Sequence, residues 1–164
     1  MERIMAREYP LIIDHDDLEL RELTDAIVIH HTGNAIDDDL SAEDINAIHR
    51  SLGWLAIGYH YVIRKDGSIE LGRPRWTTGA HAEGENHHTV GIMLCGNFDV
   101  AEPMPCQIES CAMLIANLAD GYSLDLDADT IIGHRDLCAT SCPGDNLYDK
   151  IPIIIGKAIW YACH

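Results

Sequence analysis

Short apolar runs alternate with amphipathic segments along this chain, a pattern typical of an α/β domain. Residues 26–30 (AIVIH) and 89–94 (TVGIML) are β-rich apolar runs of strand length, and we expect both to be buried strands. A third short strand is expected at 130–133. The turn signal HTGN follows the first run directly, so this strand should carry His30 and His31 at its exit.

Two segments have the spacing of amphipathic helices. Ser41 and Asp44 have capping-box spacing ahead of apolar residues at helical intervals, which predicts a helix that ends at Gly53. Residues 105–118 show the same apolar interval and predict a second helix.

An Asp-Gly turn within 65–67 lies between two β-prone runs, 59–64 and 68–71, and predicts a β-hairpin. Because strands and helices interleave, we predict an α/β fold: a single domain with a central mixed sheet, an antiparallel hairpin within it, and helices on both faces. The sequence contains no linker-like tract and no internal repeat. We assign 26–164 to the domain and 1–25 to an N-terminal extension.

The charge balance excludes some classes of partner. The chain has 11 basic and 27 acidic residues and a formal net charge of −16. Such a surface repels phosphate backbones, so we expect no nucleic-acid partner. The longest apolar stretch, 151–158, is interrupted by a proline, a glycine and a lysine, which excludes a membrane span. The N-terminus lacks the apolar core and cleavage site of a secretory signal.

Cysteines are confined to the second half of the chain. A disulfide framework would therefore leave the first half of the chain without a cross-link, and we expect mostly free thiols. A bridge between Cys106 and Cys111 stays open as an alternative. The six cysteines are at positions 95, 106, 111, 138, 142 and 163.

Most of the ten histidines fall into four small groups, and several of them lie at predicted strand ends, where a sheet brings side chains to one edge. The segment GHRDLCATSCPG separates His134 from Cys142 by eight positions, across a loop that leaves a strand. Zinc accepts imidazole nitrogen and thiolate sulfur, and a hydrolytic site keeps three protein ligands and one open position. His30, His134 and Cys142 would make such a set. Spacing alone leaves an alternative open, in which His134 is a hydrogen-bonded loop histidine and Cys142 is a buried thiol.

The chain resembles one known family in four strings that follow one another in the family's order: IVIHHTGN, GWLAIGYHYVIRKDGSIELGR, TTGAHAEGENHHTVGIMLCGNFD and IIGHRDLCATSCPG. The family comprises phage lysozyme-type N-acetylmuramoyl-L-alanine amidases and peptidoglycan recognition proteins, and the resemblance covers about 26–149. It implies a mixed sheet with flanking helices. It also implies a zinc-dependent hydrolase that cleaves the amide bond between N-acetylmuramic acid and L-alanine of peptidoglycan, with His30, His134 and Cys142 as the zinc ligands.

The resemblance also implies catalytic residues outside the ligand set. The family's catalytic tyrosine corresponds to Tyr59, whose phenol would hydrogen-bond the attacking water or the amide oxygen; the alternative is packing at a strand start. Thr140 stands where phage members carry a lysine and recognition proteins usually a threonine. Its hydroxyl can donate to an oxyanion but carries no positive charge. Met93 stands where cytosolic recycling relatives carry a glutamate, so the general base is unassigned.

Four residues are expected to bind substrate. His81 and Asn86, in AHAEGEN, match positions that border the family's groove, and His60 belongs to the GYH string beside the catalytic tyrosine. Trp54 follows Gly53, and the two resemble a Gly-Trp pair that in this family is associated with diaminopimelate-type stem peptides. The alternative is that Trp54 is a core aromatic residue. His49, on the first predicted helix, is expected to be a surface residue.

Two rival functions stay open. Family members that lose the metal cysteine become non-catalytic peptidoglycan-binding modules, but Cys142 is present here. In the second rival, Cys142 is a nucleophile activated by His134. We expect peptidoglycan or muropeptides as partners and a monomeric chain, made in the cytoplasm and acting on the cell wall after release or non-classical export. A phage lysin, a wall-remodelling enzyme and a secreted toxin could all use such a domain.

Overall fold

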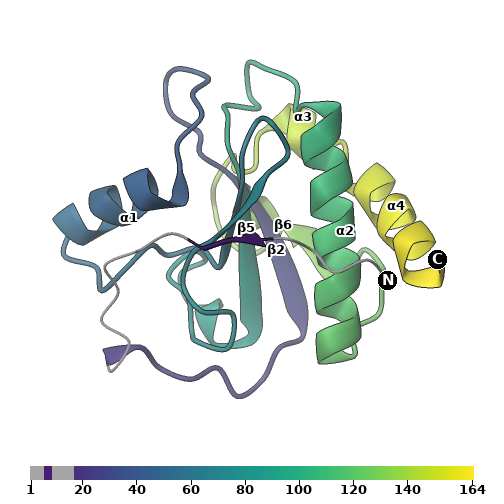
Figure 1. Cartoon of the computed structure of the whole chain (residues 1–164), viewed down its shortest axis with the longest axis horizontal. Helices are drawn as coiled ribbons and strands as arrows, with labels where there is room; N and C mark the ends of the chain where they lie inside the picture. The colour runs from purple at the N-terminus through teal and green to yellow at the C-terminus, as the bar shows by residue number, and fades with distance from the viewer. Residues whose placement is uncertain (1–5, 9–16) are drawn as a thin grey trace.

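The computed structural model describes residues 6–8 and 17–164 and contains a six-stranded mixed sheet between helices (Figure 1). The strand order is β1-β4-β3-β5-β2-β6; β3 and β4 are antiparallel, and the other neighbours are parallel. This confirms the predicted mixed sheet and its hairpin. The strands are β1 (Ala6–Arg7), β2 (Ala26–His31), β3 (Tyr61–Ile63), β4 (Ile69–Leu71), β5 (Thr89–Leu94) and β6 (Ile131–Gly133).

The helices agree with the sequence where local signals are strong. The capping box of Ser41 and Asp44 starts the first helix as predicted. The predicted end of the second helix at 118 is wrong: the helix continues until Ser123 takes a left-handed conformation (φ 56°), because the residues between are compatible with a helix. The helices are α1 (Ala42–Ser51), α2 (Pro105–Tyr122), α3 (Asp145–Tyr148), α4 (Ile151–Cys163) and the 3₁₀ turns η2 (Asn86–His88) and η3 (His134–Asp136).

The C-terminal helix α4 is absent from the sequence prediction. Its Pro152 lies in the first turn, where a missing N–H disrupts no helical hydrogen bond. Gly156 is exposed, and the apolar residues that α4 buries, Ile151, Ile154 and Ala158, pack on α2 and the sheet. The proline and the glycine that interrupt the apolar stretch are therefore compatible with a helix that buries one face. Within the described residues, no helix combines the length and apolar content that crossing a membrane requires.

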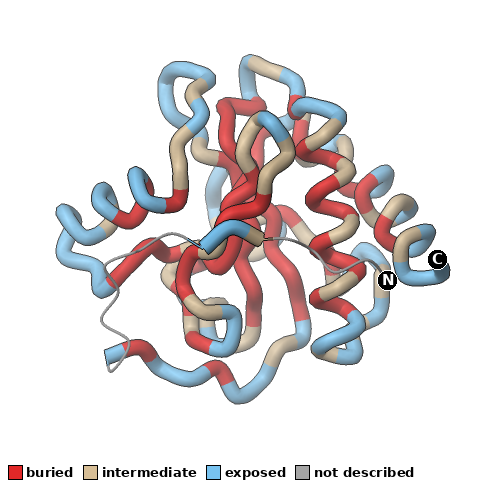
Figure 2. The backbone as a smooth tube through the Cα atoms, in the orientation of Figure 1, coloured by how far each residue is buried: buried red, intermediate tan, exposed pale blue. Residues whose placement is uncertain are grey.

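Alternate strand residues face opposite helical layers. Ile29 of β2 and Ile92 of β5 belong to the main core with α2 and α4, whereas Met93 of β5 packs with α1. His30 is paired in register with Met93, so its side chain lies on the α1 side of the sheet. Figure 2 shows that the central strands are buried, while the outer turns of α1 are exposed.

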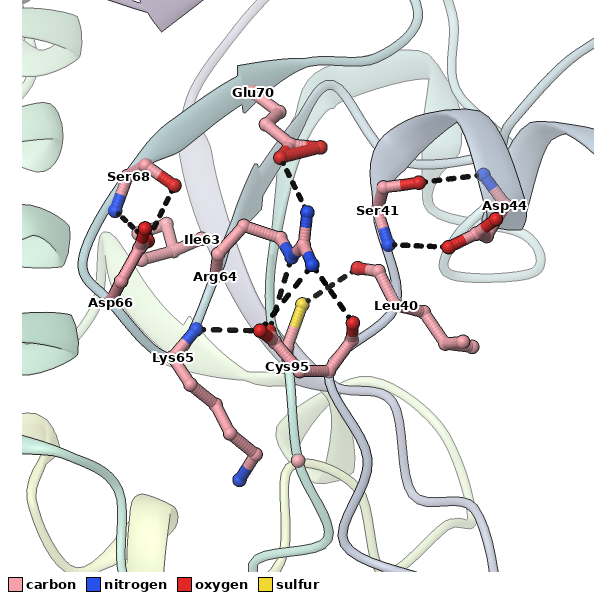
Figure 3. Close-up of polar contacts among 12 residues, drawn as sticks. Leu40, Ser41, Asp44, Ile63, Arg64, Lys65, Asp66, Ser68, Glu70 and Cys95 are labelled. Carbon is pink, nitrogen blue, oxygen red and sulfur yellow. Dashed lines mark hydrogen bonds and ion pairs between the residues drawn. The ribbon is translucent and has the colours of Figure 1, made fainter.

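The start of α1 is tied to the β3–β4 hairpin (Figure 3). The carboxylate of Glu70, which is fully buried, accepts from Arg64 Nη1 at 2.9 Å and from the backbone N–H of Ala42 at 2.8 Å. Arg64 also pairs with Asp39, at 3.1 Å, in the loop before the helix. The Glu70 carboxylate and the capping box together fix the residue at which α1 begins.

Part of the predicted N-terminal extension contacts the domain. Residues 1–5 and 9–16 of that prediction lie outside the described residues. Arg21 is buried and donates to the Thr77 carbonyl at 2.6 Å and to the Tyr122 hydroxyl at 3.1 Å. Leu20 forms an isolated antiparallel bridge with Thr77. All six cysteines are free thiols, so the alternative Cys106–Cys111 bridge is not formed.

Candidate metal centre and adjoining pocket

Two histidines meet because adjacent strands end together. β2 and β6 are parallel, and Ile29 lies opposite Gly133. The next residues along the chain are His30, within β2, and His134, the first residue of η3, and their ring centroids are 4.5 Å apart. Strand register therefore joins residues that are far apart in the sequence.

A closed loop returns Cys142 to the same place. The backbone N–H of Arg135 donates to the Cys142 carbonyl at 2.9 Å, and the N–H of Cys142 donates to Thr140 Oγ1 at 3.2 Å. After the cis Cys142–Pro143 bond, Gly144 has φ 85°, and a Cβ there would lie 2.5 Å from the backbone of Phe98. Only glycine fits this turn.

The three predicted ligands converge. Cys142 Sγ lies 3.7 Å from His30 Nδ1. One donor atom from each of His30, His134 and Cys142 falls within 4.8 Å of the others. Two imidazole nitrogens and one sulfur in this arrangement could hold a metal ion.

Burial controls the ionisation of this cluster. It lowers the pKa of His30 well below the usual value, and the neighbouring His81 and His134 add to the effect. Burial also lowers the pKa of His134. Both imidazoles are thus neutral at pH 7, the form that binds metals. Burial raises the pKa of the Cys142 thiol to about 12, against a smaller opposing effect of the His31 backbone N–H.

Tyr59 and His49 lie beside the cluster. The Tyr59 ring makes an edge contact with His30, with centroids 5.1 Å apart, and burial raises the pKa of its phenol. The prediction that His49 is a surface residue is wrong: it is half-buried, its ring lies 4.5 Å from that of Trp54, and its Nδ1 accepts from Gly58 N at 2.9 Å. The helix turns this side chain back toward the sheet.

A pocket of about 470 Å³ adjoins the cluster at His134. Of the residues predicted to bind substrate, Trp54, His81 and Asn86 line it, as does Thr140. Sequence reasoning did not find the other lining residues, most of which are small and carry no chemical signal of their own: Ala80, Ala82, Glu83, Cys138 and Ala139.

His60 is placed differently from the other predicted substrate ligands. It is buried and is not among the residues that line the pocket. Its Nδ1 accepts from Gly91 N at 3.0 Å and its Nε2 lies 2.8 Å from the Thr77 carbonyl. Both ring nitrogens are therefore engaged with the backbone.

Arg73 is a further residue that the sequence analysis did not single out. Its guanidinium is buried and donates to the carbonyls of Ile57 at 3.0 Å, Ala56 at 3.2 Å and Thr78 at 3.0 Å. It thereby joins the segment after Trp54 to the segment before the pocket-lining loop. Burial lowers the pKa of this guanidinium.

The fold and this cluster coincide with one known family. The family model described as N-acetylmuramoyl-L-alanine amidase matches residues 21–145. The chain belongs to this family. The match includes all three residues of the cluster and the residues that line the pocket, and it confirms the resemblance carried by the four sequence strings.

Three individual proteins that are similar to this chain extend the comparison. The endolysin of Escherichia phage T7 is 32% identical over 132 residues, which are 77% of this chain and 85% of the endolysin. The N-acetylmuramoyl-L-alanine amidase LysC from Clostridium intestinale URNW has a TM-score of 0.80 at 32% identity and covers 95% of this chain and 99% of its own. The ectodomain complex of peptidoglycan recognition proteins LCa and LCx, with tracheal cytotoxin bound, has a TM-score of 0.72 at 31% identity and covers 82% and 84%.

Proposed function

We propose that His30, His134 and Cys142 bind zinc, and that this amidase uses the ion to hydrolyse the bond between N-acetylmuramic acid and L-alanine of peptidoglycan. The observation that carries the proposal is the convergence of their donor atoms within 4.8 Å beside a pocket. Family membership supports the reaction, and the pocket supports a muropeptide as the ligand.

The donor set fits zinc. Donors about 2.0 and about 2.3 Å from a tetrahedral zinc lie about 3.5 Å apart, close to the 3.7 Å between His30 Nδ1 and Cys142 Sγ. The buried Cys142 thiol, with its pKa raised to about 12, would stay protonated on its own, whereas a divalent cation favours the thiolate. The same raised pKa disfavours Cys142 as a nucleophile, the second rival function.

Zinc in this place would supply Lewis-acid polarisation of the amide carbonyl and a lowered pKa for the attacking water. The protein side chains orient the reaction. Tyr59 stays a neutral phenol, because burial raises its pKa, and can donate to the developing oxyanion. Thr140 Oγ1 accepts from Cys142 N, which leaves the hydroxyl proton free to donate into the pocket.

The pocket walls suggest how a stem peptide is held. Trp54, 41% exposed, offers an aromatic surface to the pocket, and Asn86 fixes the pocket-lining loop by accepting from the backbone N–H groups of His81 and Ala82, both at 2.9 Å. We propose that the substrate lies between Trp54 and the 138–140 segment, with its scissile amide toward His134. Acting on this substrate, the chain would degrade the bacterial cell wall as a lysin or a remodelling enzyme.

Two cysteines of one loop provide the test. Cys142→Ser should lose stoichiometric zinc and the release of new amino groups from purified sacculi, since one of three ligands is gone. Cys138→Ser is the matched control for metal binding, because Cys138 lies in the same loop but does not belong to the cluster, and it should keep stoichiometric zinc. Full lytic activity in Cys142→Ser, or in the chelator-treated wild type, would refute a zinc hydrolase. Zinc and sacculus binding without amino-group release would indicate the recognition-module alternative.

A further inference from the structure

The ring of His30 has two different neighbours. Its Nδ1 faces Cys142 Sγ at 3.7 Å, and its Nε2 lies 2.9 Å from Nδ1 of His81. Both histidines are buried, and their ring planes are nearly perpendicular, at 87°. Only one proton can lie between the two nitrogens if both rings are neutral, so its position decides which His30 nitrogen is free for a cation.

A backbone carbonyl fixes the direction of this proton. The hydroxyl of Thr89 donates to the Glu85 carbonyl at 2.8 Å. Its oxygen, 3.3 Å from His81 Nε2, must therefore accept the His81 Nε2–H. His81 Nδ1 is then a lone pair that accepts from His30 Nε2–H. This series of hydrogen bonds leaves His30 Nδ1, which faces the cluster, without a proton.

The structure makes room for the His81 ring with glycine. A Cβ on Gly91, in the middle of β5, would lie 2.5 Å from His81 Cγ, and one on Gly79 would lie 2.7 Å from His81 Cδ2. The backbone N–H of His81 is held by Asn86 Oδ1. A glycine inside a strand weakens it, and close approach of another group accounts for its presence here. The ring is therefore confined as well as hydrogen-bonded.

We propose that His81 is a positioning residue that holds His30 in the Nε2–H tautomer, so that Nδ1 presents its lone pair to the metal. The inference rests on the proposed zinc function. A hydrogen-bond partner on the other ring nitrogen of a ligating histidine orients the ring and strengthens metal binding. Here the partner is a neutral imidazole, so His30 is oriented without adding the charge of a carboxylate to the buried cluster. The residue first expected to contact substrate thus acts behind the ligand, although it also borders the pocket.

Two variants of His81 separate hydrogen bonding from packing. His81→Ala removes the acceptor, whereas His81→Asn places an amide oxygen near the former Nδ1. We expect zinc affinity, measured by chelator competition, to fall about 10- to 100-fold in His81→Ala and only about 3-fold in His81→Asn. Thr89→Val, which removes only the hydroxyl, should fall between them, and exposed His87→Ala should match the wild type.

Nitrogen-15 NMR of the histidine rings in the zinc-free protein reads the tautomer directly. His30 should be the Nε2–H tautomer in the wild type and in His81→Asn, and a mixture in His81→Ala. Unchanged zinc affinity and an unchanged His30 tautomer in His81→Ala would overturn the proposal, as would an Nδ1–H His30 in the wild type. Because this measurement needs no zinc, a wild type that binds none would refute the proposed function and still test the role of His81. If His81→Ala fails to fold, Thr89→Val gives the same two readouts.

Discussion

Arg64 and Glu70 form an ion pair in which the carboxylate is fully buried and the guanidinium is partly exposed. The carboxylate also accepts from the first N–H of α1, at Ala42, so one side chain links the hairpin to the helix. Trp54 follows that helix and lines the pocket. The position of one pocket wall therefore depends on a buried charge remote from the metal cluster.

Removal of this carboxylate should destabilise the fold. Glu70→Ala leaves Arg64 without its buried partner and Ala42 N–H without an acceptor, and we expect a loss of about 3–5 kcal/mol in the free energy of unfolding. Asp39→Ala removes the partly exposed partner of Arg64 and should cost about 1 kcal/mol or less. Urea unfolding of both variants measures the difference. Equal losses would contradict the dominant role of Glu70.

Two glycines should respond to alanine in opposite directions. Gly91→Ala places a methyl group 2.5 Å from the His81 ring, which must move, and we expect a loss of about 1–3 kcal/mol. Gly156→Ala meets no atom within 4 Å on the exposed face of α4 and should stabilise the protein by about 0.5–1 kcal/mol. Thermal unfolding of both variants checks the pair; a stabilising Gly91→Ala would show that β5 does not confine His81.

His88 should make stability depend on pH. Burial alone would lower its pKa, but hydrogen bonds with the carboxylates of Glu85 and Asp25 outweigh it, and the pKa is raised. A raised native pKa means that the stabilisation is fully present below the unfolded value of about 6.5 and is lost as pH rises through the native value.

The exposed neighbour His87 isolates this effect. His88→Gln should remove the fall in unfolding free energy that His88 causes as the pH rises above the unfolded value of about 6.5. His87→Gln should retain it, because this variant leaves the contacts of His88 with Asp25 and Glu85 in place. If His88→Gln has the same pH profile as His87→Gln, the ion pairs with Asp25 and Glu85 do not act in solution.

Local signals predicted more of this structure than of its site. Ser41 and Asp44 specify the start of α1 through contacts three residues apart, and the Asp-Gly turn specifies the hairpin. The meeting of His30 with His134 depends on the register of β2 and β6, which spacing alone could not supply; the family resemblance did. No local pattern indicates that His81 lies behind His30, although Gly91 inside an apolar strand is a signal of close approach.

Tertiary contacts decide two features that local preference does not predict. The first is α4: Pro152 and Gly156 interrupt its apolar stretch, yet a proline in the first turn and an exposed glycine are both compatible with a helix. The second is His49: its helix position predicts a surface residue, but its ring contacts Trp54 and Tyr59. In each case the tertiary contact, and not the local preference, decides the outcome.

Tyr59 provides the sharpest test of catalysis apart from metal binding. Tyr59→Phe keeps the ring against His30 and removes only the phenol hydroxyl, so zinc content and stability should be unchanged while kcat falls about 100- to 1000-fold. Tyr61→Phe is the matched control, because Tyr61 lies on the opposite face of the sheet with the α2 and α4 core, and it should keep kcat. Since burial raises the pKa of Tyr59, loss of activity in mildly alkaline solution should not come from its ionisation, and the pH profiles of the wild type and Tyr59→Phe should have the same alkaline limb. A Tyr59→Phe enzyme with wild-type kcat would contradict this role of Tyr59 and would mean that zinc and Thr140 alone stabilise the oxyanion.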